Sequence, residues 1–315
     1  MTPPLAPGYP DYKANQMIAD LYSVKYQKKF YHTSPIPLMT NSDFAADVNK
    51  RGDKVVIPVR PTITVKSYPV GGTMTMENPN AAPIEFPMDR SNYFYFGIDK
   101  ITKKQLVDGS KFIDECTLDG GEQVNTTIAG EFLDDIVGDA HASNKGNSAG
   151  VTSANIKLGT TGTFPTFTSV NILKYIIACQ VVGDEQNWPD EGRWICIPSA
   201  VAGCIQLSDL KDVSLSGDAG GSMVRHGRLG RIGKMVILES NQVKKVTDGA
   251  STCFHIPFGH ISAVGFASNV IESVYFDRFE HTCGEGLRVT NLYDWATVNS
   301  KGLGVLYGAA DLGLD

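Results

Sequence analysis

The sequence predicts an α+β protein in which the first 90 residues are extended chain and the rest form a packed body. Of the 16 prolines, 12 lie in the first 90 residues, and 28 of the 32 glycines lie after them. Proline removes a ladder donor from a strand and ends helices, so this first part must lie against another surface. After residue 98, stretches with helical spacing mix with short β-rich runs, without an internal repeat.

Length and charge exclude several classes of protein. A chain of 315 residues, 42% of them hydrophobic, buries a core of its own without disulfides or metals. The net charge of −6 argues against a protein whose main task is to bind nucleic acid. Residues 1–90 carry 10 Lys/Arg against 8 Asp/Glu, whereas residues 91–315 carry 18 against 26. This split suits a basic arm that docks on acidic neighbours, and ordinary surface scatter accounts for it equally well.

The cysteines and termini predict a soluble protein made in a cytoplasm. The six cysteines lie far apart with no CxxC pair, which fits a reducing compartment. The N-terminus lacks the basic flank and apolar run of a secretory signal. No apolar stretch approaches the roughly 20 residues that span a bilayer, so we expect no membrane contact.

The N-terminal part predicts an arm followed by a long hairpin. Residues 12–30 have loosely helical apolar spacing and end in a lysine-rich turn. Prolines break residues 33–41, and a short segment follows at 44–48.

Residues 53–98 predict the hairpin itself. Its outgoing arm covers 55–59 and 62–66, and its return covers 83–88 and 93–96. An isolated two-stranded hairpin is only marginally stable in water, so we expect this one to lie on its own chain or on a neighbour.

The body predicts two longer helices and several buried strands. The first helix has apolar residues at 124, 128, 132 and 136 and ends near Gly138, and the second begins at an N-cap Thr168 and ends before Gly183. Later segments follow in order: a surface excursion at 142–163, a strand at 193–198, a short helix at 199–207, a glycine-rich loop at 209–231, a strand at 234–239, mixed strand and helix at 253–275, and late strands at 272–280 and 287–306.

One dense group of potential metal ligands stands out, comprising Asp277, Glu280, His281, Cys283 and Glu285. Strand alternation places some of them on opposite faces, which splits the set, so a solvated strand-to-turn face is the stronger interpretation. His255 and His260 are five residues apart with Pro257 and Gly259 between them, which is not a helical ligand pair.

The remaining chemical candidates are better explained by structure. Glu131, Asp134 and Asp135 resemble a carboxylate pair for acid–base work, but on an amphipathic helix they are its wet face. Aromatic residues 93–96 have few basic companions, so packing explains them better than base stacking. Gly227, Gly230 and Gly233 have GxxGxxG spacing before a strand, which indicates a turn and no dinucleotide fingerprint. We therefore expect no catalytic, cofactor-binding or metal-binding residues and no enzyme activity.

Several runs resemble tailed-phage major capsid proteins of the Hong Kong 97 shell fold. The run GDKVVIP at 52–58 opens the hairpin, and YFYFGID at 93–99 is similar to its return. WICIPS at 194–199 followed by a helix, GRIGKMVILESN at 230–241 and GHISAVGFA at 259–267 follow in the order seen in that family.

The resemblance implies a division of the chain into segments of that fold. They are an N-terminal arm at 1–51, an extended β-hairpin loop at 52–98, a peripheral domain at 99–185 with a spine helix at about 120–138, an axial domain at 186–272, and return strands of the peripheral domain at 273–315.

The resemblance also implies a function and partners. The chain would assemble in the host cytoplasm as pentamers and hexamers into an icosahedral virion head around double-stranded DNA, which it contacts only weakly and non-specifically. Portal and scaffolding proteins are expected partners, a cement protein is a further one, and no cofactor is implied. Because the chain starts at Met1 with only a short arm, we expect a separate scaffolding protein. Lys66 lies in the hairpin, but no motif marks partners for a covalent cross-link.

Two other classes of protein stay open. One is another virion component, of the tail or of a decoration layer, and the other is a soluble enzyme with a metal held by His281 and Cys283. Particle shape separates the first alternative from a shell protein, and metal content separates the second.

Overall fold

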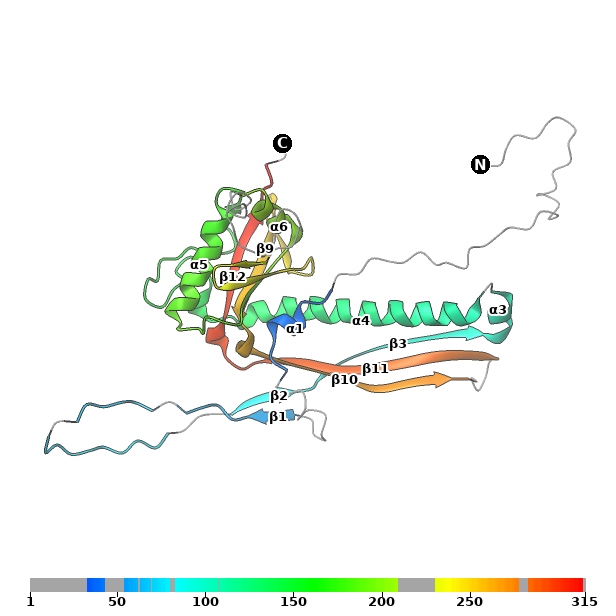
Figure 1. Ribbon diagram of the computed structural model, residues 1–315, viewed down its shortest axis with the longest axis horizontal. Coiled ribbons are helices and arrows are strands. Elements are labelled where there is room, and N and C mark those ends of the chain that lie inside the picture. Colours follow the sequence, from blue (N-terminus) through cyan, green and yellow to red (C-terminus); the bar gives the residue numbers. More distant parts are fainter. Residues whose placement is uncertain are drawn as a thin grey trace, which may run out of the picture.

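The structure is a computed structural model that describes residues 33–42, 54–61, 63–68, 70–79, 83–106, 108–208, 230–277 and 283–313. A long helix and a long sheet run from a mixed α/β body in one direction (Figure 1). A thin arm, made of an outgoing and a returning segment of the same chain, projects from the same region in the opposite direction. The expected arm helix at 12–30, the segment at 44–48 and the loop at 209–229 lie outside the described residues.

The long helix α4 covers Gly109–Asp139 and begins well before the expected residue 120. The side chain of Asp108 caps it by accepting a hydrogen bond from the backbone N–H of Lys111 at 3.0 Å. Gly120 and Gly121 lie inside α4, although glycine usually weakens a helix. Here a Cβ on Gly120 would lie 3.0 Å from the ring of Phe94, so glycine lets the helix approach the sheet closely.

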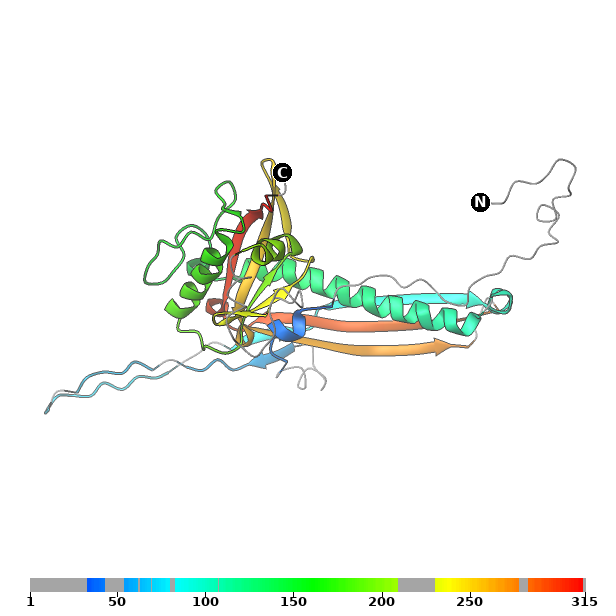
Figure 2. The ribbon, with the colours of Figure 1, turned by 45° about the horizontal axis from the view of Figure 1, so that its top comes forward.

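A three-stranded antiparallel sheet in the order β10-β11-β3 lies beneath α4 (Figures 1 and 2). Its strands are β3 (Arg90–Asp99), β10 (Val264–Phe276) and β11 (Gly284–Thr297). Phe132 of α4 packs edge-on against Phe266 and Trp295 of the sheet, with ring centroids 6.5 and 5.6 Å apart. The expectation that residues 93–96 return the hairpin is wrong, because β3 pairs with β11 along its whole length. The short helix α3 (Lys100–Gln105) connects β3 to α4.

The hairpin is confirmed at its base. There β1 (Lys54–Ile57) pairs antiparallel with β2 (Ile84–Pro87), and Ile57 lies opposite Ile84. Before it, the one-turn helix α1 (Ile36–Met39) leads to Asn41, which forms a parallel bridge to Gly265 of β10. The proline-rich segment 33–41 is thus held on the edge of the long sheet.

The body contains a seven-stranded mixed sheet. Its strands are β4 (Thr166–Phe167), β5 (Arg193–Ile197), β6 (Arg231–Ile232), β7 (Met235–Glu239), β8 (Lys245–Asp248), β9 (Ser251–His260) and β12 (Leu303–Ala310). Every residue of β5 is buried, as the apolar run 193–198 predicts. The helices are α5 (Ile172–Glu185) and α6 (Ser199–Gln206), and one-turn 3-10 helices occur at Ala142–Asn144, Ile261–Ala263 and Ser300–Gly302.

The N-cap of α5 differs from the expected Thr168. Asn171 occupies the cap position, and its side-chain oxygen accepts a hydrogen bond from the backbone N–H of Thr168 at 2.8 Å. The carbonyl of Thr168 in turn accepts the N–H of Ile172 at 3.1 Å. Thr168 therefore opens a turn that precedes the helix. The α+β class is confirmed, and among the described helices none is long and apolar enough to cross a membrane.

Candidate functional site

The most distinctive surface of the molecule is the part of the hairpin beyond β1 and β2, which we call the projecting arm (described residues 58–79). It extends away from the body without packing on it (Figures 1 and 2). Its large apolar side chains are exposed: Val65 at 95%, Val70 at 102%, Met74 at 75% and Met76 at 87%. Single exposed apolar residues are ordinary, but a contiguous set on an extended segment marks an interaction surface.

Polar contacts hold the two sides of the projecting arm together. The carboxylate of Glu77 accepts the backbone N–H of Thr64 at 3.0 Å, and the ammonium of Lys66 donates to the hydroxyl of Thr75 at 3.1 Å. Lys66 also lies 3.6 Å from the carboxylate of Glu77. These exposed contacts set the alignment of the two sides and contribute little stability.

A small hydrophobic cluster, which we call the root cluster, anchors the arm to the long sheet. It contains Ile57, Phe86, Met88 and Ala267, all at most 8% exposed. Phe86 is fully buried. Because Ala267 belongs to β10, the root cluster joins the base of the hairpin to the long sheet while the main core lies elsewhere.

The face of the long sheet opposite α4 is also partly uncovered. Tyr93 and Tyr95 point away from the helix and are 73% and 53% exposed, whereas Phe94 packs on α4. On β11, Arg288 contacts both carboxylate oxygens of Glu272 at 2.8 Å. Alternation along β3 thus splits aromatic residues 93–96 between the two faces, and Phe94 fits the packing interpretation.

Glu131, Asp134 and Asp135 lie on the wet face of α4, as expected, and two of them, Glu131 and Asp135, also form a junction with the sheet while 42% and 46% exposed. Arg90 of β3 forms ion pairs with Asp135, with Glu131 at 3.7 Å and with the buried Asp294 at 3.5 Å. The hydroxyl of Tyr293 donates to Glu131 at 2.7 Å.

Two further features of this junction follow from that geometry. Burial, followed by the Glu131 hydrogen bond, raises the pKa of Tyr293 to about 12. The guanidinium of Arg90 also lies 4.0 Å above the ring of Trp295. Sequence reasoning missed this junction because its partners lie 41 or more residues apart.

The two described carboxylates of the candidate metal group serve as partners of lysines. Asp277 lies 3.4 Å from the ammonium of Lys100, and the buried Glu285 pairs with Lys103. The hydrogen bond from Lys103 lowers the pKa of Glu285. Cys283 is exposed, while Glu280 and His281 lie outside the described residues. Within the part of the chain that the structure describes, no three His, Cys, Asp or Glu side chains gather as a metal site would require.

The two histidines of β9 have separate surroundings. His255 packs against Tyr307 with ring centroids 4.5 Å apart and ring planes tilted by 46°, and burial lowers the pKa of His255. His260 shares hydrogen bonds with the hydroxyl of Ser262 at 2.7 Å and the carbonyl of Glu191 at 2.8 Å, so it fixes a loop.

The glycine and cysteine candidates also have structural roles. Gly233 has φ +57° in the turn between β6 and β7, where a Cβ would lie 2.5 Å from the Gln180 side chain. Gly227 lies outside the described residues. Burial raises the pKa of Cys196 to about 12 and raises that of Cys179 further, so both thiols behave as apolar side chains.

Comparison with known proteins places this architecture. No family model matches the chain, and no curated protein matches it. A solved structure from Mycobacterium phage Che8 is similar, with a TM-score of 0.70, 20% identity, and coverage of 92% of this chain and 97% of that one.

Two capsid structures are similar over comparable lengths. The capsid of Cyanophage P-SCSP1u has a TM-score of 0.67, 14% identity and coverage of 94% of each chain. The mature capsid of bacteriophage PhiM1 has a TM-score of 0.62, 13% identity, and coverage of 95% of this chain and 93% of that one. Because these matches cover 94% and 95% of this chain, the chain has the fold of phage capsid proteins.

Proposed function

We propose that this chain is the major capsid protein of a tailed phage, with the Hong Kong 97-like shell fold, and that it assembles as pentamers and hexamers into an icosahedral head around double-stranded DNA. The observation that carries the proposal is the projecting arm, whose apolar residues have no cover within the described chain. The capsid fold of the similar structures supports it. In this proposal the segments 1–51, 52–98, 99–185, 186–272 and 273–315 are the arm, hairpin loop, peripheral domain, axial domain and return strands, except that the hairpin ends with β2, since β3 belongs to the long sheet.

The physical argument is one of burial. An extended apolar segment that lies on no surface of its own chain gains free energy only when another molecule covers it. Shell subunits provide such a surface in every neighbour, and obligate interfaces commonly exceed about 2,000 Å² in total. A basic protein gains affinity for DNA with each phosphate that its Lys and Arg side chains neutralise. The acidic composition of this chain therefore fits weak, non-specific contact with packaged DNA.

The proposal is tested by replacing Val65, Val70, Met74 and Met76 together with serine. Because these side chains are exposed, we expect an unchanged unfolding midpoint but no closed particles by negative-stain microscopy. The matched control replaces the same valines with isoleucine and the same methionines with leucine, and it should still assemble. Normal shells from the serine variant would refute the role of the arm.

The wild-type chain separates the alternative functions. Closed particles or capsomers support the shell proposal, whereas small rings, tubes or trimers favour a tail or decoration component. A stoichiometric metal ion in the purified protein would favour the enzyme alternative.

Portal, scaffolding and cement proteins belong to the proposal as partners. If the scaffolding protein is a separate chain, subunits of immature and mature particles should have the same mass on denaturing gels. A larger precursor in immature particles would contradict it.

A further inference from the structure

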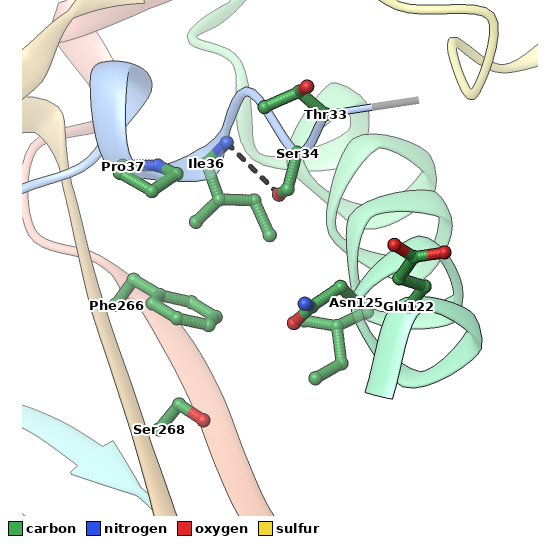
Figure 3. Close-up of a pocket in the computed structure, with 9 residues that line it drawn as sticks. Thr33, Ser34, Ile36, Pro37, Glu122, Asn125, Phe266 and Ser268 are labelled. Carbon is green, nitrogen blue, oxygen red and sulfur yellow. Dashed lines mark hydrogen bonds between the residues drawn. The ribbon is translucent and has the colours of Figure 1, made fainter. Parts of the chain in front are cut away.

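A pocket of about 490 Å³ lies where α1, α4 and β10 meet. Figure 3 shows Thr33 and Ser34 on one side, Glu122 and Asn125 of α4 on another, and Phe266 of β10 opposite them. We call it the α1–α4 pocket. Nothing in the function proposed above uses it, since the projecting arm leaves the molecule elsewhere.

The α1–α4 pocket combines an apolar floor with a polar rim. Ile36 and Ile128 are 3% and 4% exposed and line it together with Phe266. On the rim, Glu122 and Asn125 are exposed. Among the described residues, Glu122 has no ion-pair partner and the amide of Asn125 has no hydrogen-bond partner. A floor and rim of this kind suit an aromatic side chain accompanied by a cation.

The surroundings of the rim are acidic. The residues of α4 include eight Asp or Glu and one Lys. Glu115, Asp119 and Glu122 recur at i, i+4 and i+7, which places them on one side of the helix leading to the pocket. This arrangement favours a basic occupant.

The position of Thr33 identifies an occupant. The described chain begins at Thr33, which itself lines the pocket, and 32 further residues precede it. These residues contain four lysines and two aspartates, and their last eight read KYQKKFYH. Phe30 is three residues from Thr33, within about 10 Å of extended chain. Such a tether gives an effective concentration on the order of millimolar.

We propose that residues 25–32 dock into the α1–α4 pocket of their own chain, with the ring of Phe30 on the apolar floor and Lys29 beside Glu122. The inference needs no neighbouring subunit, so it holds or fails independently of shell assembly. It gives the basic N-terminal segment a defined acidic partner on the same chain.

The test is disulfide trapping in the full chain. In a background where Cys116 and Cys283 are replaced by serine, Lys29→Cys is combined with Glu122→Cys. Mild oxidation should link the two positions within one chain, detected by peptide mass spectrometry, at a yield that does not change over a tenfold range of protein concentration. Adding Phe30→Ser should lower the rate of cross-linking at least fivefold.

The matched control combines Lys29→Cys with Thr127→Cys. Thr127 is also exposed on α4, but it lies about 140° around the helix from Glu122. We expect at least tenfold slower cross-linking there, with reduced variants that unfold at the wild-type midpoint.

Three outcomes would overturn the proposal. The first is equal cross-linking at 122 and 127, and the second is no cross-linking in a folded variant. The third is covalent dimers that increase with concentration, which would show that a second copy supplies the occupant of the pocket.

Discussion

Arg193 offers the sharpest test of how the body is held together. Its side chain is 1% exposed and donates to three oxygens at 2.6 Å: the carbonyl of Pro189, the carbonyl of Trp188 and the carboxylate of Asp184. It also donates to the carboxylate of the exposed Asp190 at 3.3 Å. One guanidinium thus fixes the loop that joins α5 to β5. The substitution Arg193→Met keeps the length of the side chain and removes all four hydrogen bonds.

The expected loss follows from the groups left behind. The carbonyl of the buried Trp188 loses its partner, and a buried unsatisfied group costs about 1–3 kcal/mol. The carbonyl of the exposed Pro189 bonds to water instead, so its lost hydrogen bond costs about 1 kcal/mol. Asp184 keeps Lys234 at 3.0 Å and is 44% exposed, so its own penalty is small. The sum is about 2–4 kcal/mol of unfolding free energy. For a chain of this size this lowers the midpoint by roughly 3–6 °C.

The assay is thermal and urea unfolding of the purified full chain, followed by circular dichroism. Lys234→Met is the matched control. It removes a more exposed cation from the same carboxylates and should leave the midpoint close to wild type. A loss below about 1 kcal/mol in Arg193→Met would refute the reasoning, because it would show that water satisfies both carbonyls.

Two further predictions concern backbone strain and pH. Gly159 has φ +89°, and a Cβ there would lie 2.1 Å from the carbonyl oxygen of Tyr307, so Gly159→Ala should cost more than about 3 kcal/mol. Gly162→Ala, at φ +80° with open space, should cost only about 1–2 kcal/mol in the same urea titration, and equal losses would contradict the steric argument. Because burial lowers the pKa of His255 in the folded state, its stabilising contribution is complete above pH 6.5 and is lost as pH falls below that value. His255→Gln should therefore flatten the dependence of the midpoint between pH 7 and pH 5.5, and an unchanged slope would contradict this assignment.

Local patterns were enough to predict the elements whose signal lies within one short segment. The buried run at 193–198 became β5, and the apolar stripe before Gly183 became α5. The base of the hairpin was also predictable, because β-rich runs flank an irregular tip. In each case the residues that decide the structure are neighbours in the sequence.

Long-range pairing could not be predicted in this way. Residues 93–96 look like the return of a hairpin, yet β3 pairs with β11, which lies about 190 residues later in the chain. The sequence places Glu131 and Asp135 on the wet face of a helix, but it does not indicate that both carboxylates pair with Arg90 of β3. The residues next to a position in the sequence do not reveal a partner that lies far along the chain. Strand register and ion pairs of this kind can therefore be known only from the folded structure.

The projecting arm is long, whereas the root cluster that attaches it to the long sheet is small. The chain from Ile57 to Gly71 spans up to about 45 Å when extended. A rotation of about 10° at the base would therefore move the tip by roughly 8 Å. The root cluster consists of Ile57, Phe86, Met88 and Ala267 and is separate from the main core, so such a rotation disturbs few buried contacts. In the shell proposed above, an arm attached at so small a base would let the same folded body meet neighbours at positions with different local curvature.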